Sequence, residues 1–275
     1  MIKDLLNKCG IKPNKRMGQN FLIDESVLEK IISAAELSEN DSVLEIGPGL
    51  GILTFALAKK AKKVIAVEKD KDLARILNNE LRIKNIKNVE IVHSDILKVH
   101  NSLFQIHDSY KLVANLPYYI TSPIIRMFLE NPPAGKKPEL MVLMIQKEVA
   151  ERICAKLGQM SILSIAVQFY ARPEIISIVP KTSFYPQPKV DSAIIKILPK
   201  KILPKIDTEK FFNLTRAGFS AKRKFLISNL SRKLQIANGE LQIAFRRAEI
   251  DLKSRAENLN VEDWIKIYEN IEKNI

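Results

Sequence analysis

Short apolar runs alternate with amphipathic, helix-like stretches along the chain as far as Pro199. Most of these runs are apolar throughout, which is typical of strands in a parallel sheet that is covered on both faces. The runs that we predict to be its strands are Val43–Ile46, Val64–Val67, Val89–His93, Leu112–Asn115 and Leu140–Ile145. Two later runs, Ile175–Val179 and Ala193–Leu198, return on each other and should add an antiparallel edge. The pattern therefore predicts an α/β fold with seven strands in one sheet.

The pattern changes at Lys200–Pro204, where proline and lysine residues interrupt it. Only helix-like stretches follow, and they are Phe211–Phe219, Lys224–Leu234, Leu241–Arg247 and Val261–Ile271. We therefore predict two domains, residues 1–200 with the sheet and residues 201–275 as a small all-helical domain. Trp264 and Tyr268 are one helical turn apart, so we expect them in the core of the small domain.

A glycine-rich turn follows the first predicted strand and contains Gly47, Gly49 and Gly51. Glycine allows positive φ and lets a ligand approach the backbone closely. The second strand ends in Glu68, about 20 residues further on, which is the layout of a nucleoside site in a doubly wound α/β fold. A carboxylate accepts hydrogen bonds without donating any, so Glu68 can take both ribose hydroxyls at once.

The spacing of these glycines distinguishes two classes of cofactor. A dinucleotide fingerprint, G-x-G-x-x-G, counted from Gly47 needs its third glycine where this chain has Ile52, and Gly51 comes one residue early. Glu45, beside the turn, would face a pyrophosphate unfavourably, but it suits a cofactor with an ammonium and a sulfonium. We therefore expect S-adenosylmethionine next to Glu45, Gly47 and Gly49, and not a nicotinamide or flavin dinucleotide.

The fourth predicted strand ends in Asn115-Leu116-Pro117-Tyr118. Pro117 has no amide proton and keeps its neighbour extended, so the Leu116 carbonyl can lie beside the Asn115 carboxamide. Two acceptors would then converge on one exocyclic amine, while Tyr118 offers the face of its ring to a base. An isolated tetrapeptide of this kind is more often a plain turn with a buried tyrosine, and the glycine-rich turn favours the functional interpretation.

Several blocks of sequence occur in one order: Lys15–Leu22, Glu45–Gly51, Asn115–Ile120, Gln146–Val149, Phe184–Ser192, Phe219–Lys224 and Arg255–Leu259. Together they resemble the ribosomal RNA adenine dimethyltransferase family over nearly the whole chain. The resemblance implies a Rossmann-like class I methyltransferase sheet. It also implies N6-dimethylation of two adjacent adenosines in a hairpin loop near the 3′ end of small-subunit ribosomal RNA.

The same resemblance assigns roles to further residues. It implies that Asp95 accepts a hydrogen bond from the adenine amine of the cofactor and that Ile96 supplies an apolar edge. Asn20 and Leu22 match positions that close the cofactor pocket. Phe184 is implied to sandwich the target adenine on the side opposite the tyrosine of the tetrapeptide, although a core aromatic that anchors the loop is the alternative for this residue.

The net charge of +13 favours a polyanionic partner. The only acids between Lys196 and Lys233 are Asp207 and Glu209, so positive charge is concentrated beyond the sheet domain. Concentrated lysine and arginine residues suit a phosphate backbone better than a uniformly basic surface does. The residues that we expect to contact RNA are Lys222, Arg223 and Lys224.

Other features argue against a membrane protein, a disulfide framework and a metal site. No apolar stretch reaches the roughly 18 residues that span a bilayer, and the start of the chain lacks a signal-peptide core, so we expect a cytoplasmic protein. Cys9 and Cys154 are far apart, and the histidines have no ligand-like partners. We expect a monomer that acts on an assembling ribosomal subunit.

Two alternatives remain open. One is the related group that methylates an adenine of large-subunit ribosomal RNA and confers macrolide resistance, although Arg255–Leu259 and Phe184–Ser192 favour the small-subunit enzyme. The other is a non-catalytic ribosome assembly factor with the same fold. Intact Asn115, Tyr118 and Glu68 argue against lost activity.

Overall fold

The computed structural model describes most of the chain. Its described residues are 13–14, 17–98, 109–132 and 136–272. Cys9, Lys15 and Arg16 lie outside them, whereas Cys154 is described and half-buried. No helix in the described ranges is both long enough and apolar enough to cross a membrane.

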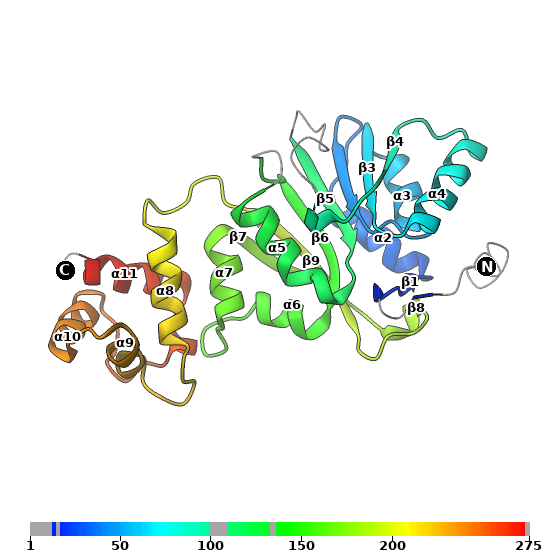
Figure 1. Cartoon of the computed structure of the whole chain (residues 1–275). Helices are drawn as coiled ribbons and strands as arrows, with labels where there is room; N and C mark the ends of the chain where they lie inside the picture. Colours follow the sequence, from blue (N-terminus) through cyan, green and yellow to red (C-terminus); the bar gives the residue numbers. More distant parts are fainter. Residues whose placement is uncertain (1–12, 15–16, 99–108, 133–135, 273–275) are drawn as a thin grey trace. The chain divides into compact units, whose positions relative to one another are not determined.

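The chain folds as two compact units (Figure 1). The first is made of the described residues up to Ala150 together with Arg172–Pro199, and it contains the sheet. The second is made of Glu151–Ala171 and the residues from Lys200 onward, and it is helical. The second unit therefore also takes in a helix that precedes the last strands of the sheet.

Seven strands of the described chain form one mixed sheet in the order β4-β3-β2-β5-β6-β9-β7. Their bounds are β2 (Ser42–Ile46), β3 (Lys63–Glu68), β4 (Val89–His93), β5 (Tyr110–Asn115), β6 (Leu140–Gln146), β7 (Ala171–Val179) and β9 (Ser192–Pro199). The strands β2 to β6 pair in parallel, and β9 is antiparallel to β6. All the predicted strands and the antiparallel edge are confirmed.

Burial on both faces explains why these strands have uninterrupted apolar sequences. Leu112 and Val113 in β5 are 0% exposed, and no residue of Leu140–Ile145 in β6 is more than 4% exposed. Each fully buried aliphatic side chain contributes about 1.5–3 kcal/mol relative to an exposed one. The central strands are therefore the most strongly fixed part of the unit, and their carboxyl ends form a rigid edge.

Helices flank the sheet and connect its strands. They are α2 (Glu25–Ala34), α3 (Ile52–Ala58), α4 (Lys71–Ile83), α5 (Thr121–Glu130) and α6 (Lys147–Ile153). Helix α2 begins after Asp24, whose Oδ1 accepts a hydrogen bond from the Ser26 N–H at 3.0 Å and so caps the helix. Its buried face carries Val27 and Ile31. Figure 1 shows α3 and α4 beside β3 and β4, which they contact.

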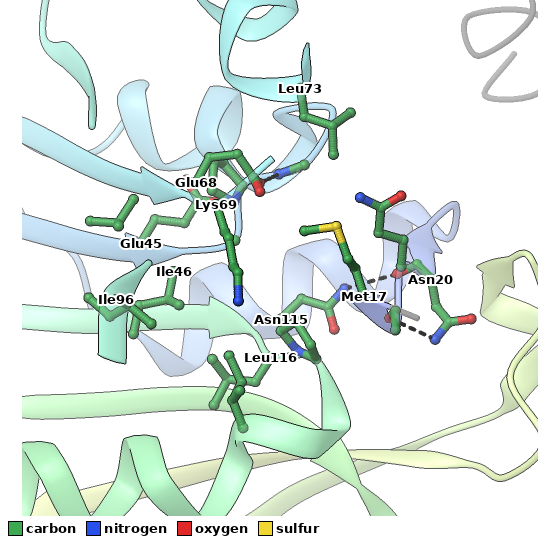
Figure 2. A pocket seen from close by; sticks show the side chains of 18 of the residues that line it. Met17, Asn20, Glu45, Ile46, Glu68, Lys69, Leu73, Ile96, Asn115 and Leu116 are labelled. Carbon is green, nitrogen blue, oxygen red and sulfur yellow. Dashed lines mark hydrogen bonds between the residues drawn. The ribbon is translucent and has the colours of Figure 1, made fainter. Parts of the chain in front are cut away.

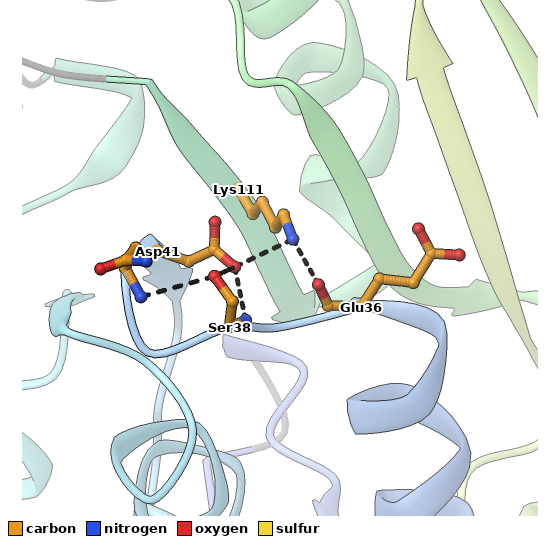
Figure 3. A network of polar contacts seen from close by, with 5 residues as sticks. Glu36, Ser38, Asp41 and Lys111 are labelled. Atoms are coloured by element: carbon orange, nitrogen blue, oxygen red, sulfur yellow. Dashed lines mark hydrogen bonds and ion pairs between the residues drawn. The ribbon is translucent and has the colours of Figure 1, made fainter.

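A polar network anchors the opposite edge of the sheet, at the amino end of β5 (Figure 3). Lys111 Nζ lies 3.0 Å from Asp41 Oδ2 and also donates to the Glu36 carbonyl. The same Asp41 oxygen accepts from the Ser38 N–H at 2.6 Å. Burial alone would raise the pKa of Asp41, but the hydrogen bonds from Ser38 and Lys111 lower it below its ordinary value. The loop before β2 is thus tied to the start of β5.

Two short strands form a second, two-stranded sheet that the sequence pattern does not predict. β1 (Phe21–Leu22) pairs antiparallel with β8 (Phe184–Tyr185), with Phe21 opposite Tyr185 and Leu22 opposite Phe184. A strand of two residues is too short to show periodicity in the sequence. The pairing joins the segment before α2 to the loop between β7 and β9.

The helical unit has an aromatic core. Its helices are α7 (Ile162–Tyr170), α8 (Thr208–Gly218), α9 (Leu226–Leu234), α10 (Asn238–Arg247) and α11 (Val261–Glu272). Trp264 is 0% exposed and Tyr268 is 7% exposed, so their predicted core position is confirmed. The Trp264 ring stacks on Phe219, with centroids 5.7 Å apart. A Cβ at Gly218 would lie 2.3 Å from the Trp264 ring, so only glycine fits at this position.

Candidate active site

The order of the strands reverses between β2 and β5, because the chain builds outward from β2 to β4 and then returns to place β5 on the other side of β2. In open α/β sheets such a switch point leaves a crevice at the carboxyl ends of the strands. A cavity with an empty volume of about 1220 Å³, part of it open to solvent, lies here. Figure 2 shows side chains from several strand ends pointing into it.

The cavity collects every residue that the sequence analysis assigns to the cofactor and to the target base. These residues are Asn20, Leu22, Glu45, Gly47, Gly49, Glu68, Asp95, Ile96, Asn115, Leu116, Pro117, Tyr118 and Phe184. Parallel strands place their carboxyl ends along one edge, so residues far apart in sequence meet there. Their individual roles remain predictions.

The glycine-rich turn brings backbone N–H groups to the cavity wall. Gly49 has a φ of +58°, and a Cβ at this position would lie 3.2 Å from the Phe21 ring. Its N–H donates to Glu68 Oε2 at 3.0 Å. Gly51 has a φ of +83° and begins α3, where a Cβ would lie 2.3 Å from Leu77. Glycine is therefore required at both places, and the turn approaches its neighbours closely.

Glu68, at the end of β3, is held by backbone donors on both carboxylate oxygens. Oε2 accepts from Gly49, and Oε1 accepts from the Asp70 N–H at 2.8 Å. Burial raises its pKa, while these two backbone hydrogen bonds lower it. Since each carboxylate oxygen has more than one lone pair, Glu68 keeps acceptor capacity for hydroxyl groups of a ligand.

Glu45, at the end of β2, is 1% exposed. Its Oε2 and the Thr54 hydroxyl make no hydrogen bond of good geometry among the residues that the structure describes. Burial raises the pKa of Glu45 to about 8, the nearby Thr54 hydroxyl lowers it, and the Glu68 carboxylate adds to the rise. A buried carboxyl group without a charged partner is costly in its ionised form, and a cationic ligand would relieve that cost.

Asn115 and Leu116 present two acceptors at the end of β5. The Asn115 side chain donates from Nδ2 to the Asn20 carbonyl at 3.4 Å, which leaves Oδ1 without a donor in the described part of the chain (Figure 2). The Leu116 N–H donates to the Met144 carbonyl at 3.1 Å, and no described donor reaches the Leu116 carbonyl. Pro117 follows with φ −55° and ψ 132°, an extended conformation.

The two aromatic residues predicted to hold a base are placed differently. Tyr118 is half-buried, its hydroxyl lies 2.9 Å from Ser192 Oγ, and burial raises its pKa. Phe184 lines the cavity but is only 3% exposed, and it packs in the core with Leu22 and Val179. The Tyr118 ring is therefore fixed at its hydroxyl end, whereas Phe184 also serves the packing of the loop.

The sequence analysis missed Lys69, which lines the cavity directly after Glu68. Its Nζ lies 2.9 Å from Asp95 Oδ2, and Asp95 Oδ1 accepts from the Leu97 N–H at 3.1 Å. The hydrogen bond from Lys69 lowers the pKa of Asp95, and Asp95 in turn raises the pKa of Lys69. The position of Lys69 next to a strand-end acid is the one signal in the sequence that could have identified it.

Gln19 is a second residue of the cavity wall for which the sequence gives only a weak indication. Its Nε2 donates to Asp70 Oδ2 at 3.0 Å, and its Oε1 accepts from the Asn14 N–H at 2.8 Å. The segment before β1 is thereby tied to the loop after β3. His93, by contrast, is exposed and does not line the cavity. No group of three or more His, Cys, Asp or Glu residues that could hold a metal ion occurs within the described ranges.

The residues around the cavity fit S-adenosylmethionine. The Glu45 carboxyl, whose Oε2 has no hydrogen-bond partner among the described residues, suits a cation. The backbone of Gly47 and Gly49 lines the cavity, and Glu68 retains acceptor capacity. The fold and the cavity define a class I S-adenosylmethionine-dependent methyltransferase. Residues 10–273 match the family described as "Ribosomal RNA adenine dimethylase". The chain belongs to this family.

Relatives and solved structures agree with this assignment. The chain is 45% identical over 268 residues to "Ribosomal RNA small subunit methyltransferase A" of Dehalococcoides mccartyi, covering 96% of this chain and 90% of the relative. It is 45% identical over 274 residues to the protein of the same name in Clostridium botulinum, covering 96% of each. The crystal structure of a dimethyladenosine transferase from Plasmodium falciparum superposes with a TM-score of 0.77 and 29% identity, covering 92% of this chain and 98% of the other.

A second solved structure is that of the 23S rRNA methyltransferase ErmE. It superposes with a TM-score of 0.75 and 27% identity, covering 92% of this chain and all of the other. The common fold of these structures extends over both units of the chain, because each match covers 92% of it.

Proposed function

We propose that this protein transfers methyl groups from S-adenosylmethionine to N6 of two adjacent adenosines in the 3′-terminal hairpin loop of small-subunit ribosomal RNA. The observation that carries the proposal is the pair of acceptors at the end of β5, Asn115 Oδ1 and the Leu116 carbonyl oxygen, to which no donor of the described residues is bonded. Both belong to the cavity that also contains Glu45 and Glu68. The cavity therefore contains residues suited to bind a methyl donor and residues suited to bind the amine that receives the methyl group.

The cofactor would be held by groups from three strand ends. Glu68 accepts from the ribose hydroxyls, Asp95 accepts from the adenine amine, and Ile96 packs against the edge of the ring. Glu45 faces the cationic part, with the backbone of Gly47 and Gly49 alongside. When bound, S-adenosylmethionine supplies an electrophilic methyl group on a positively charged sulfur.

The target amine needs help because its lone pair is delocalised into the adenine ring. In the first transfer, Asn115 Oδ1 and the Leu116 carbonyl accept hydrogen bonds from its two N–H groups, which favours a pyramidal nitrogen with the lone pair available for attack. In the second transfer one N–H remains, so one of the two acceptors is used. Holding the amine in line with the methyl group lowers the barrier further, since orientation alone can supply several kcal/mol, up to about 7–11. The methylated nitrogen is cationic and acidic, so it loses its proton afterwards, and a strong base before attack is not required.

The adenine enters this cavity only when it is unpaired or flipped out of a helix. Tyr118, fixed by Ser192, offers one ring face to it. Phe184 is the proposed second face, because it lines the same cavity although most of its side chain is buried. Stacking of this kind contributes about 1–3 kcal/mol per base.

The relatives favour small-subunit RNA over large-subunit RNA as the substrate. Identity is 45% to proteins named for the small subunit and 27% to the 23S rRNA methyltransferase. A non-catalytic assembly factor is not favoured either, since the acceptor pair, Tyr118 and Glu68 are all present in the cavity. The protein would act in the cytoplasm as a monomer on an assembling subunit, with RNA contacts from Lys222, Arg223 and Lys224.

Primer extension tests the proposal directly. Small-subunit particles and large-subunit RNA, both unmethylated, are incubated with the protein and S-adenosylmethionine, and reverse transcription then stops at dimethylated adenosines. We expect adjacent stops near the 3′ end of small-subunit RNA only. Stops in large-subunit RNA would show that the protein acts as a large-subunit RNA methyltransferase. Stops in neither RNA would contradict the proposed activity.

A further inference from the structure

The turn between α8 and α9 and the loop after α10 form one surface in the helical unit. We define it as the basic–aromatic surface, made of Lys222–Phe225 and Lys253–Arg255. The two segments adjoin because the Leu226 N–H donates to the Ser254 carbonyl at 2.8 Å. The sequence separates them by almost thirty residues, so only the fold shows that they are neighbours.

The backbone of this surface is held firmly. Asn229 is 1% exposed, and its Nδ2 donates to the Gly218 carbonyl at 2.7 Å and to the Ala221 carbonyl at 3.0 Å. In the second segment, Asp251 Oδ1 accepts from the Lys253 N–H at 2.9 Å. Side chains on a preformed backbone lose less entropy when a partner binds. The surface therefore presents its side chains from a backbone that is already ordered.

The surface is strongly cationic. Its charged side chains are all exposed, and they are Lys222, Arg223, Lys224, Lys253 and Arg255. None of these makes an ion pair with a carboxylate within the described ranges. No acid occurs inside either segment. Unpaired cations that lie together on one surface attract a polyanion.

Phe225 adds an exposed aromatic ring to this surface. It occupies the position before the first turn of α9, where its side chain cannot cap the helix, and it is 46% exposed. Its neighbour Leu226 is 0% exposed, so the apolar contact of this segment with the core is made by Leu226. Phe225 is thus an aromatic ring that faces solvent among cations, which is the combination that binds unpaired nucleotides.

We propose that Phe225 is a stacking platform for an unpaired nucleotide of the ribosomal RNA, whose flanking phosphates are bound by Lys253 and the Lys222–Lys224 cations. This inference rests on the proposed function, because it takes the substrate to be RNA, and it adds Phe225 and Lys253 to the residues expected to contact RNA. It also predicts a preference for single-stranded RNA, since a base inside a duplex is already stacked on its neighbours and cannot stack on a protein ring.

Two replacements of Phe225 test the aromatic ring. Phe225→Leu keeps apolar bulk without an aromatic face, and Phe225→Tyr keeps the face. For the full chain binding a single-stranded RNA oligonucleotide, we expect Phe225→Leu to weaken binding about tenfold, the loss expected for one stacked base. Phe225→Tyr should bind within about twofold of wild type by the same argument. Binding to the same strand in a duplex should change little in either variant.

Ile243→Ala is the matched control, because Ile243 is 49% exposed on α10 of the same unit. It should bind the oligonucleotide like wild type. Lys253→Gln should lower the slope of log affinity against log salt by up to about 0.7, the value for one phosphate contact on a single strand. Phe225→Leu should leave this slope unchanged, since it removes no charge.

Several results would overturn the inference. Equal binding by Phe225→Leu and wild type would show that the ring is only exposed bulk. A loss of affinity that depends on Phe225 for vesicles of anionic lipid, but not for RNA, would assign the surface to a membrane. Methyl transfer by wild type to small-subunit RNA is measured in parallel, so that failure of the proposed function is distinguished from failure of this inference alone.

Discussion

Lys69 Nζ lies 2.9 Å from Asp95 Oδ2 at the mouth of the cavity, so the carboxylate proposed to recognise the cofactor's adenine is already paired with a lysine. The Lys69 side chain is 52% exposed and that of Asp95 is 20% exposed. An ion pair with a lysine that is this open to solvent adds little to the stability of a fold. The pair therefore orients Asp95 more than it stabilises the fold.

This arrangement predicts unequal effects of two substitutions. Asp95→Ala removes an ionised acceptor, whose hydrogen bond contributes about 1.5–3 kcal/mol, so the dissociation constant for S-adenosylmethionine should rise by roughly tenfold or more. Lys69→Met keeps the aliphatic stem and should change the constant by about threefold or less. Calorimetric titration of both variants measures the difference, and equal losses would assign the main role to the ion pair.

The ribose assignment of Glu68 is tested in the same titration. Glu68→Ala should weaken binding of S-adenosylmethionine by roughly tenfold or more, because charge-assisted hydrogen bonds are lost. Glu90→Ala is the control, since Glu90 is an exposed acid on the neighbouring strand, paired with Lys63. Circular dichroism must show an intact fold for both. Unchanged affinity in Glu68→Ala would remove Glu68 from the proposed site.

The raised pKa of Glu45 makes stability depend on pH. Burial keeps the folded-state pKa near 8, above the ordinary value of 4.5. Such a group stabilises the fold below its unfolded pKa, and this contribution is lost as the pH rises through the folded value. Glu45→Gln should therefore gain in melting temperature relative to wild type across the window from 4.5 to about 8. A difference that is constant with pH would show that Glu45 is ionised in the fold.

Asn115→Ala should affect turnover much more than affinity. The acceptor matters most as the adenine nitrogen becomes pyramidal, so its removal raises the barrier while leaving both substrates bound. Loss of one preorganised group of this kind costs about a hundred- to a thousand-fold in rate. Single-turnover transfer of labelled methyl to unmodified small-subunit particles measures the effect. A rate near wild type would make the tetrapeptide a structural turn.

The strands and the membership of the site could be predicted for a common reason. Fully buried strands such as Leu140–Ile145 have apolar sequences, and parallel strands bring their carboxyl ends to one edge, so Glu45, Glu68 and Asn115 had to meet once the strand order was known. The family resemblance implies a class I methyltransferase sheet, and the structure supplies the strand order. Trp264 could be assigned to a core because it pairs with Tyr268 one turn away.

Contacts that depend on loop conformation could not be predicted. The Gly49 N–H reaches Glu68 only because the turn adopts a positive φ, and Lys69 reaches Asp95 across two loops whose geometry leaves no trace in hydrophobic periodicity. The hydrogen bond from Asn229 Nδ2 to the Gly218 carbonyl also depends on loop conformation. These contacts follow from the fold and are invisible to any argument from spacing alone.

The pairing of β1 with β8 has a consequence for how the two substrates enter. Asn20, whose carbonyl accepts from Asn115, directly precedes β1, and Phe184 lies in β8 itself. The segment proposed to close the pocket of the methyl donor and the segment proposed to contact the base are therefore joined directly by the antiparallel pairing of β1 with β8. We therefore expect a change at Phe184 on binding of a base to be transmitted through this pairing to the segment around Asn20.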